Sequence, residues 1–221
     1  MSAKGRREGP PVPFDYFPTP AWCVDRLLDD CAADLFEGAA NILEPTVGDG
    51  AIVRAVEGWH RERGRRVGTW TGIELRHVEH EPLVTHHIGG VDFRAIRCGY
   101  FDCAIGNPPY CDAESIIRHA LQMSDRAAFL LRVGFLGSAE RVPFWRKHGH
   151  LPFGLRVLPD RPSFDGEGTD SATYAWFVWG CPGVTGVKVL ETTPIEVRSA
   201  QKPRDMSSVD PRQCGLFEAA S

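Results

Sequence analysis

The fold of this chain is decided by a ten-residue stretch, NILEPTVGDG at residues 41–50. Residues 41–44 are typical of a short strand, and a glycine turn follows directly. After the turn, apolar side chains recur at helical spacing, at Ile52, Val53, Val56 and Trp59. Glycines at a strand-to-helix turn let the backbone approach a ligand closely, and the start of the helix presents free N–H groups. The stretch therefore predicts the first strand and helix of an α/β fold, with a ligand site between them.

A second hydrophobic strand, residues 67–73, ends in Glu74. An acidic residue at the end of a second strand is well placed to accept hydrogen bonds from two ribose hydroxyls. The glycine turn has only two of the three glycines of the dinucleotide fingerprint, which is a weak signal alone. The alternative role for Glu74 is an ordinary helix cap.

The most informative residues for chemistry are Asn107, Pro108, Pro109 and Tyr110, which follow a predicted buried strand at residues 101–106. The two prolines exclude regular structure and hold the tetrapeptide in one extended shape. The side-chain carbonyl of Asn107 and the backbone carbonyl of Pro108 can then face the same point. Two acceptors followed by an aromatic ring suit the binding of a planar group that carries an NH2. The alternative is a plain turn, which Asn-Pro commonly opens.

The remaining pattern alternates helices and strands. Thr19 is expected to cap a first helix, with Pro20 in its first position and Gly38 at its end. A helix from Asp112, a buried strand at 127–133 and a helix from 138 to 149 follow. Strands near 155–158 and 173–179 predict an antiparallel hairpin at the sheet edge. We expect a doubly wound, mostly parallel sheet with an antiparallel final strand.

These motifs, in this order, resemble S-adenosylmethionine-dependent amino-methyltransferases, most closely the small, phage-like adenine-N6 DNA methyltransferases with the gamma motif order. The resemblance covers residues 15–180 and implies a Rossmann-like class I methyltransferase domain. It implies S-adenosylmethionine as cofactor, with contacts from Phe17, Thr19, Pro20, Glu44, Thr46, Gly48, Gly50, Glu74, Asp92, Phe93 and Asn107. In this resemblance, Glu44 reaches the cofactor's ammonium, and Asp92 reads its adenine amine.

The same resemblance makes residues 107–110 the catalytic motif. Asn107 and Pro108 would accept hydrogen bonds from the amine of a flipped-out adenine, and Tyr110 would stack on the base. Pro109 and Tyr110 would line the base pocket. Phe164, in a loop at 160–171 rich in turn formers, would supply a second ring opposite Tyr110. An alternative role for Phe164 is a hydrophobic plug that anchors the loop.

Size and hydropathy set the domain limits. With 221 residues and 43% hydrophobic content, the chain can bury one α/β core. We expect a flexible arm at 1–14, the methyltransferase domain at 15–180, and a polar, partly disordered tail at 181–221 that is too short for a separate target-recognition domain. The sequence has no apolar run of membrane-spanning length and no signal-peptide pattern. We therefore expect no membrane partner and a cytoplasmic place in a bacterial or phage-infected cell.

Charge bears on the nucleic-acid partner. A net charge of −4 and a pI near 6.1 give no global basic field for DNA. Arg141 and Arg161 are the expected phosphate contacts, within a wider basic group that also includes Arg146, Lys147 and Arg156. Nucleic acid is the expected partner, with DNA favoured over RNA, and a homo-oligomer or a partner subunit stays open.

Metal binding is not expected. Seven cysteines without paired spacing suit a reducing interior, and Cys103 lies inside a predicted strand. The cluster of His77, His80, His86 and His87 is expected in a solvated helix or loop.

Two other classes of function stay open at this stage. The same tetrapeptide could hold an amine of an RNA base or the side-chain amide of a protein glutamine. The chain could also be a non-catalytic, methyltransferase-like binding subunit, because fold alone does not decide function.

Overall fold

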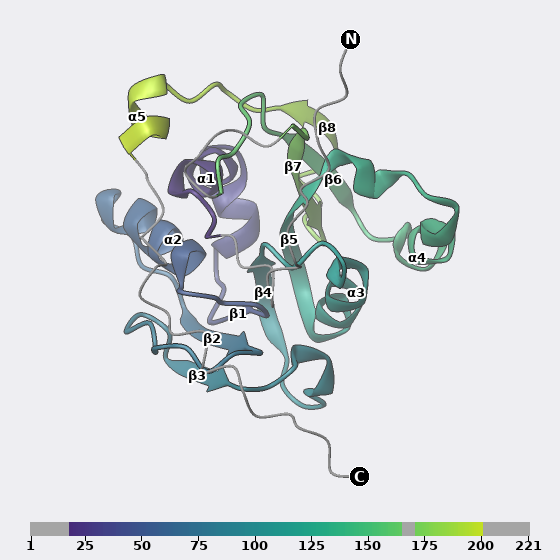
Figure 1. Cartoon of the computed structure of the whole chain (residues 1–221), viewed down its shortest axis with the longest axis horizontal. Helices are drawn as coiled ribbons and strands as arrows, with labels where there is room; N and C mark the ends of the chain where they lie inside the picture. The colour runs from purple at the N-terminus through teal and green to yellow at the C-terminus, as the bar shows by residue number, and fades with distance from the viewer. Residues whose placement is uncertain (1–17, 165–170, 201–221) are drawn as a thin grey trace, which may run out of the picture.

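A computed structural model of the chain describes residues 18–164 and 171–200 (Figure 1). The strands are β1 (Asn41–Glu44), β2 (Thr69–Glu74), β3 (His86–Gly89), β4 (Phe101–Gly106), β5 (Ser124–Arg132), β6 (Phe153–Val157), β7 (Tyr174–Trp179) and β8 (Gly186–Val189). The helices are α1 (Ala21–Phe36), α2 (Ala51–Glu62), α3 (Ala113–Met123), α4 (Val142–His148) and α5 (Ile195–Ala200). Three 3-10 turns are η1 (Phe93–Ala95), η2 (Val133–Leu136) and η3 (Ala139–Arg141).

All eight strands form one sheet in the order β3-β2-β1-β4-β5-β7-β6-β8. Strands β1, β2, β3, β4 and β5 pair with one another in parallel. Strand β7 is antiparallel to both β5 and β6. The strand order reverses beside β1, whose neighbours are β2 and β4. Such a reversal opens a crevice at the carboxyl ends of the strands, where α/β proteins bind ligands. The predicted doubly wound, mostly parallel sheet is confirmed.

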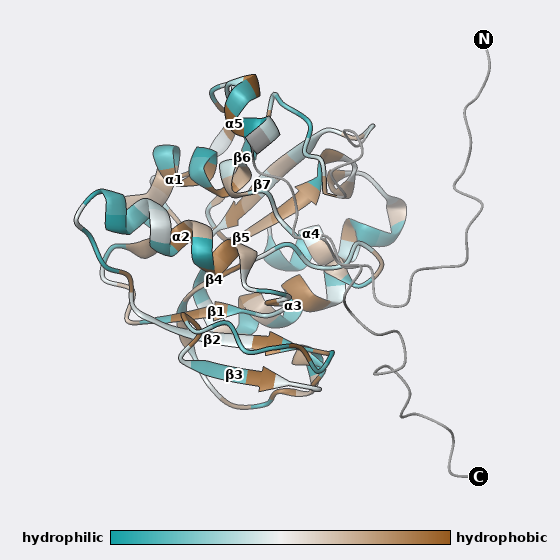
Figure 2. Ribbon diagram, turned by 60° about the vertical axis from the view of Figure 1, so that its left-hand side comes forward, coloured by the Kyte–Doolittle hydropathy of each residue, from teal (hydrophilic) through white to brown (hydrophobic). Residues whose placement is uncertain are grey.

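Helices cover both faces of the sheet, because its central strands are apolar on both sides. In β5, Ala128 and Leu130 join the core under α1 and α2, whereas Ala127, Phe129 and Leu131 join the core under α3 and α4. This alternation follows from the two-residue period of a strand. Strands β5 and β7 are correspondingly hydrophobic along most of their length (Figure 2).

The expected antiparallel pair of the last strands is confirmed as β6 and β7, but this pair does not form the edge of the sheet. Strand β6 is not an edge, because β8 pairs with it in parallel on its far side. Arg156 of β6 is buried and bonds Asp30 of α1, with Nε and Oδ2 2.5 Å apart. Asp30 also binds Lys188 of β8. Strand β8 and α5 thus continue the structure past Gly180, where the domain was expected to end, and residues 201–221 lie outside the described part.

Two local expectations were wrong. Helix α1 begins at Ala21 with Pro20 at its N-cap, so Thr19 lies one residue before the cap and does not cap it. His86 and His87 lie in strand β3, not in a solvated helix or loop, because they pair in parallel with β2. Within residues 18–164 and 171–200, no helix is long and apolar enough to cross a membrane.

Candidate functional site

A cavity of about 400 Å³ lies at the carboxyl ends of β1, β2 and β4. Its wall includes five carboxylates and two guanidiniums, from Glu44, Asp49, Glu74, Asp92, Asp112, Arg76 and Arg94. The excess of negative charge favours a ligand that carries positive charge.

The glycine turn after β1 forms one side of this cavity. Gly48 and Gly50 have φ values of +56° and +79°, which side chains rarely adopt. A Cβ at Gly50 would also lie 2.5 Å from Cγ of Glu81. The amide of Gly48 donates to Oε2 of Glu74 at 2.9 Å, and Oε1 of Glu74 accepts from the backbone and side chain of Arg76. These bonds fix the turn against the acid that ends β2.

Two polar atoms in the cavity wall are buried without a hydrogen-bond partner among the described residues: Oε2 of Glu44 and Oγ1 of Thr46. Glu44 is 2% exposed. Burial, reinforced by the nearby charges of Asp49 and Glu74, raises the pKa of Glu44 well above its ordinary value. A buried carboxyl oxygen without a hydrogen-bond partner is costly. Both atoms are therefore placed to bind a polar or cationic ligand.

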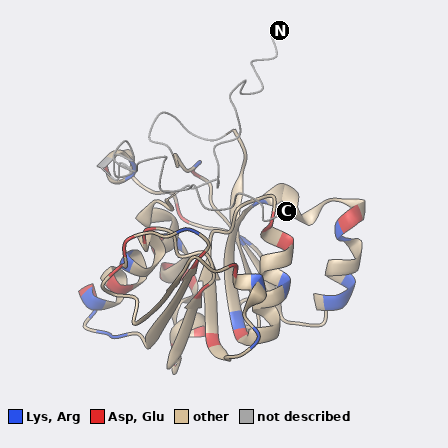
Figure 3. Cartoon of the chain, turned by 60° about the horizontal axis from the view of Figure 1, so that its bottom comes forward, with Lys and Arg blue, Asp and Glu red and all other residues tan. Residues whose placement is uncertain are grey.

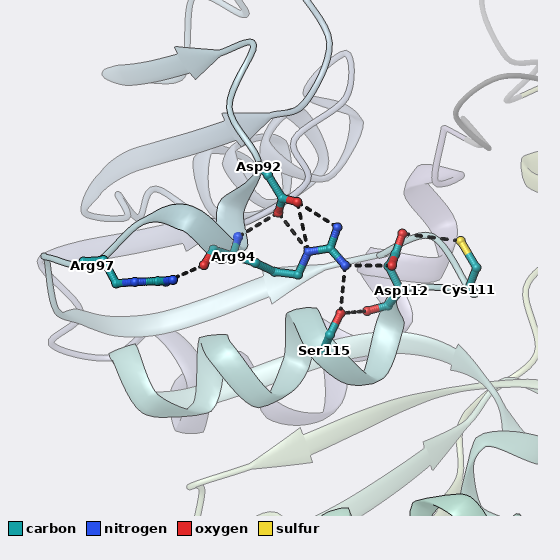
Figure 4. Close-up of polar contacts among 6 residues, drawn as sticks. All are labelled: Asp92, Arg94, Arg97, Cys111, Asp112 and Ser115. Carbon is teal, nitrogen blue, oxygen red and sulfur yellow. Dashed lines mark hydrogen bonds and ion pairs between the residues drawn. The ribbon is translucent and has the colours of Figure 1, made fainter. Parts of the chain in front are cut away.

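Asp92 and Phe93 form the opposite side, on the segment that follows β3. The carboxylate of Asp92 accepts hydrogen bonds from Nε and Nη2 of Arg94 at donor–acceptor distances of 2.7–3.0 Å (Figure 4). Nη1 of Arg94 donates a hydrogen bond to Oδ1 of Asp112 at 2.8 Å, and Asp112 lies at the start of α3. The Arg94 side chain holds the pKa of Asp92 below its ordinary value. Arg94 therefore joins the η1 segment to the loop that follows β4.

Asn107 begins that loop at the end of β4 and also lines the cavity. Its Nδ2 donates to Oγ1 of Thr19 at 3.1 Å. Pro108 is buried, and Asn107, Pro109 and Tyr110 are half-buried. The two prolines leave the loop with no backbone donor at these positions.

Tyr110 lies beside β5 and β7 and does not line the cavity. Its hydroxyl donates to the hydroxyl of Tyr174 at 2.8 Å, which also accepts from Nε of Arg132 at 3.0 Å. The Arg132 guanidinium carbon lies 4.6 Å from the Tyr110 ring centroid, within cation–π range. Phe164 is 6% exposed and packs edge-on against Tyr174 at 5.1 Å. This position corresponds to the plug alternative for Phe164.

The expected phosphate contacts differ in their surroundings. Arg161 is exposed in the loop after β6, and Arg141 packs over Phe135 with its Nε 4.0 Å from Glu114. Arg156 is buried in an ion pair with Asp30, so it does not belong to the group of basic residues expected to contact phosphates. Lys and Arg residues are scattered over several elements, with Asp and Glu among them (Figure 3).

The cavity thus brings together many of the predicted cofactor residues: Thr19, Glu44, Thr46, Gly48, Glu74, Asp92, Phe93 and Asn107, together with Pro109. Pro20, Gly50 and Pro108 adjoin these residues in the chain without lining it. Phe17 lies outside the described residues. Sequence reasoning missed three residues of this region: Arg94, Arg132 and Tyr174. Of these, only Arg94 could have been suspected from the sequence, because it lies two residues after Asp92.

No group of three or more His, Cys, Asp or Glu residues within the described ranges could hold a metal ion. His80 and His87 do pair, with ring centroids 5.2 Å apart.

No protein-family model and no curated protein matches the sequence. Solved structures do resemble it. A modification subunit of a type I restriction enzyme from Vibrio vulnificus has a TM-score of 0.58 at 17% identity, covering 85% of this chain and 50% of the other. A type I methyltransferase subunit from Streptococcus thermophilus has a TM-score of 0.54 at 14% identity, covering 84% and 51%. A protein described as a class I S-adenosylmethionine-dependent methyltransferase from Listeria monocytogenes has a TM-score of 0.52 at 13% identity, covering 81% and 65%.

This chain spans about half to two thirds of the length of these proteins. At such low identity the likeness concerns the fold alone. The chain has the Rossmann-like fold of class I methyltransferases.

Proposed function

We propose that this chain is an S-adenosylmethionine-dependent methyltransferase that acts on the exocyclic N6 amine of adenine in DNA, by direct transfer to a flipped-out base. One observation carries the proposal. The acidic cavity, whose wall contains the unpartnered Oε2 atom of Glu44, is also lined by Asn107, whose side-chain NH2 donates to Thr19. The carbonyl oxygen of Asn107 is thereby left for a substrate amine.

The donor set of the cavity fits this cofactor, which carries an ammonium and a sulfonium. Glu44 would hold the ammonium, because its buried carboxyl group gains a partner there. Glu74 would accept from the ribose, and Asp92 with Phe93 would hold the adenine. S-adenosylmethionine, when bound, supplies an electrophilic methyl group.

The chain's own residues would prepare the acceptor. Oδ1 of Asn107 and the carbonyl of Pro108 would accept the two N–H groups of the amine. These bonds draw the nitrogen lone pair out of the ring and stabilise the positive charge that develops on nitrogen. Positioning is the main task, and a strong general base is not required.

A base must leave the duplex to reach this loop, at a cost of a few kcal/mol. Stacking on Tyr110 would offset part of that cost. Arg141 and Arg161 would contact phosphates. A structurally similar protein belongs to a type I restriction–modification system described by its complex assembly, and we propose that here too a partner subunit or a second copy supplies sequence recognition.

The test is methyl transfer from radiolabelled S-adenosylmethionine onto unmethylated DNA, total RNA and denatured protein in parallel. We expect label on DNA, recovered as N6-methyladenine. Asn107→Ala should abolish transfer and retain cofactor binding, measured by calorimetry. Asn41→Ala, the same change at an exposed asparagine, is the matched control. Normal turnover by Asn107→Ala would contradict the mechanism, and label on RNA or protein alone would contradict the DNA assignment.

A further inference from the structure

The contact between Thr19 and Asn107 joins two segments that are 88 residues apart in the chain. Thr19 lies just before α1, and Asn107 is the first residue of the loop that follows β4. Both line the same cavity. The bond is therefore a direct polar link between residues 18–20 and the loop that carries the substrate acceptors.

The orientation of the Asn107 amide decides what the loop can bind. One end of an asparagine amide is an acceptor, and the other is a double donor. A substrate amine donates two N–H groups, so it needs the oxygen of Asn107. An amide turned by 180° would present its NH2 to the amine and repel it. The loop backbone alone does not choose between these two states.

Thr19 holds the amide in the first of these states: its hydroxyl, which could also donate, accepts from Nδ2 of Asn107. It is 6% exposed and lies between Pro18 and Pro20, whose rings restrict the backbone on both sides. Its side chain is β-branched, so few rotamers are available. Its hydroxyl oxygen is consequently held in place as the acceptor for Nδ2 of Asn107.

We propose that Thr19 is the positioning residue that orients the Asn107 amide, with Oδ1 toward the substrate amine. This inference rests on the proposed function and adds a role for Thr19 that is separate from cofactor contact. Thr19→Val keeps the shape of the side chain and removes the acceptor, whereas Thr19→Ser keeps the hydroxyl.

The first readout is turnover at saturating cofactor and DNA. We expect Thr19→Val to lower kcat about tenfold, because the transition state would lose the stabilisation that one hydrogen bond provides. Thr19→Ser should stay within about threefold of the original chain. A purely cofactor-binding residue would instead raise KM for the cofactor and leave kcat at saturation unchanged, and that result would overturn the proposal.

The second readout does not depend on activity. In ¹⁵N-labelled protein, the side-chain NH2 pair of Asn107 is assigned by its absence from Asn107→Ser. We expect a downfield-shifted proton in the original chain and in Thr19→Ser, and its loss in Thr19→Val with unchanged melting temperature. An identical NH2 pair in all three would overturn the inference. Absence of methyl transfer with the expected NH2 signals would overturn the proposed function and leave the orienting bond established.

Discussion

The guanidinium of Arg132 lies over the ring of Tyr110, 4.6 Å from its centroid, and Nε of the same arginine donates to Tyr174. Arg132 and Tyr174 are directly paired across β5 and β7. The position of the Tyr110 ring is therefore set by a cross-strand pair from the part of the sheet where direction reverses.

Tyr174→Phe tests this arrangement. The change removes the acceptor for the hydroxyl of Tyr110 and for Nε of Arg132, while the buried ring stays. We expect a loss of about 1 kcal/mol in the free energy of unfolding, the usual net value of a hydrogen bond, because Tyr110 is half-buried and Arg132 is exposed to water. Urea unfolding measures it, and Tyr100→Phe, at an exposed tyrosine, is the control.

Glu44→Gln should separate stability from binding. The neutral amide relieves the burial of a carboxyl group, so we expect a higher melting temperature without ligand at pH 8. Affinity for S-adenosylhomocysteine should fall at least about tenfold, because a charged hydrogen bond to its ammonium is lost. Affinity for 5′-methylthioadenosine, which lacks the amino-acid part, should not change. An equal loss for both ligands would place Glu44 elsewhere than at the ammonium.

Asp25 predicts a pH dependence. Burial, aided by the charge of Asp29, raises the pKa of Asp25 to about 6. The folded chain thus holds a proton that the unfolded chain releases near its ordinary pKa of about 4. The contribution of protonated Asp25 to the free energy of unfolding is fully present below about pH 4 and is lost as the pH rises through about 6. The melting temperature of Asp25→Asn, relative to the original chain, should therefore increase from pH 4 to pH 7. A constant difference would contradict the assignment.

Arg94→Met should loosen the link between η1 and the start of α3. The ion pairs of Arg94 are partly exposed, at 40% for its side chain, so we expect at most about 1 kcal/mol of lost stability. Hydrogen exchange should nevertheless become faster in residues 109–116, next to Asp112. Exchange in β7 serves as the internal reference, and unchanged rates at 109–116 would show that the link does not hold the loop.

The ion pair of Arg156 with Asp30 is buried, with side chains 7% and 10% exposed. Arg156→Met alone should cost about 1–3 kcal/mol, because the buried carboxylate of Asp30 loses one of its two cationic partners and keeps only Lys188. Arg156→Met combined with Asp30→Leu should recover most of that loss. Chemical denaturation of the two single variants and the double variant measures the coupling.

Sequence reasoning succeeded where the determinants are local. The turn after β1 and the loop after β4 are specified by glycines and prolines within a few residues, and their strands end where the apolar runs end. Because parallel strands present their carboxyl ends at one edge, Glu44, Glu74 and Asn107 could be expected to meet there.

Sequence reasoning failed where pairing is distant. The place of β7 between β5 and β6, and the addition of β8, depend on contacts between segments far apart in the chain. The contact of Arg132 with Tyr174 depends on strand register, which no local pattern specifies. Thr19 was assigned to a helix cap because Thr-Pro is a common helix start, and its actual partner lies 88 residues away.

The position of β7 has a consequence for synthesis. Among the residues that the structure describes, those that line the cavity all fall within 18–116, whereas both sheet partners of β6 come later in the chain than β6 itself. On the ribosome, the cavity-bearing half can therefore assemble first, with β5 as an open edge until residues 174–179 emerge. An open apolar edge invites pairing with other chains. A nascent chain stalled before residue 174 would carry the cavity residues on a sheet whose β5 edge is still unpaired, and we expect such a chain to aggregate or to bind chaperones.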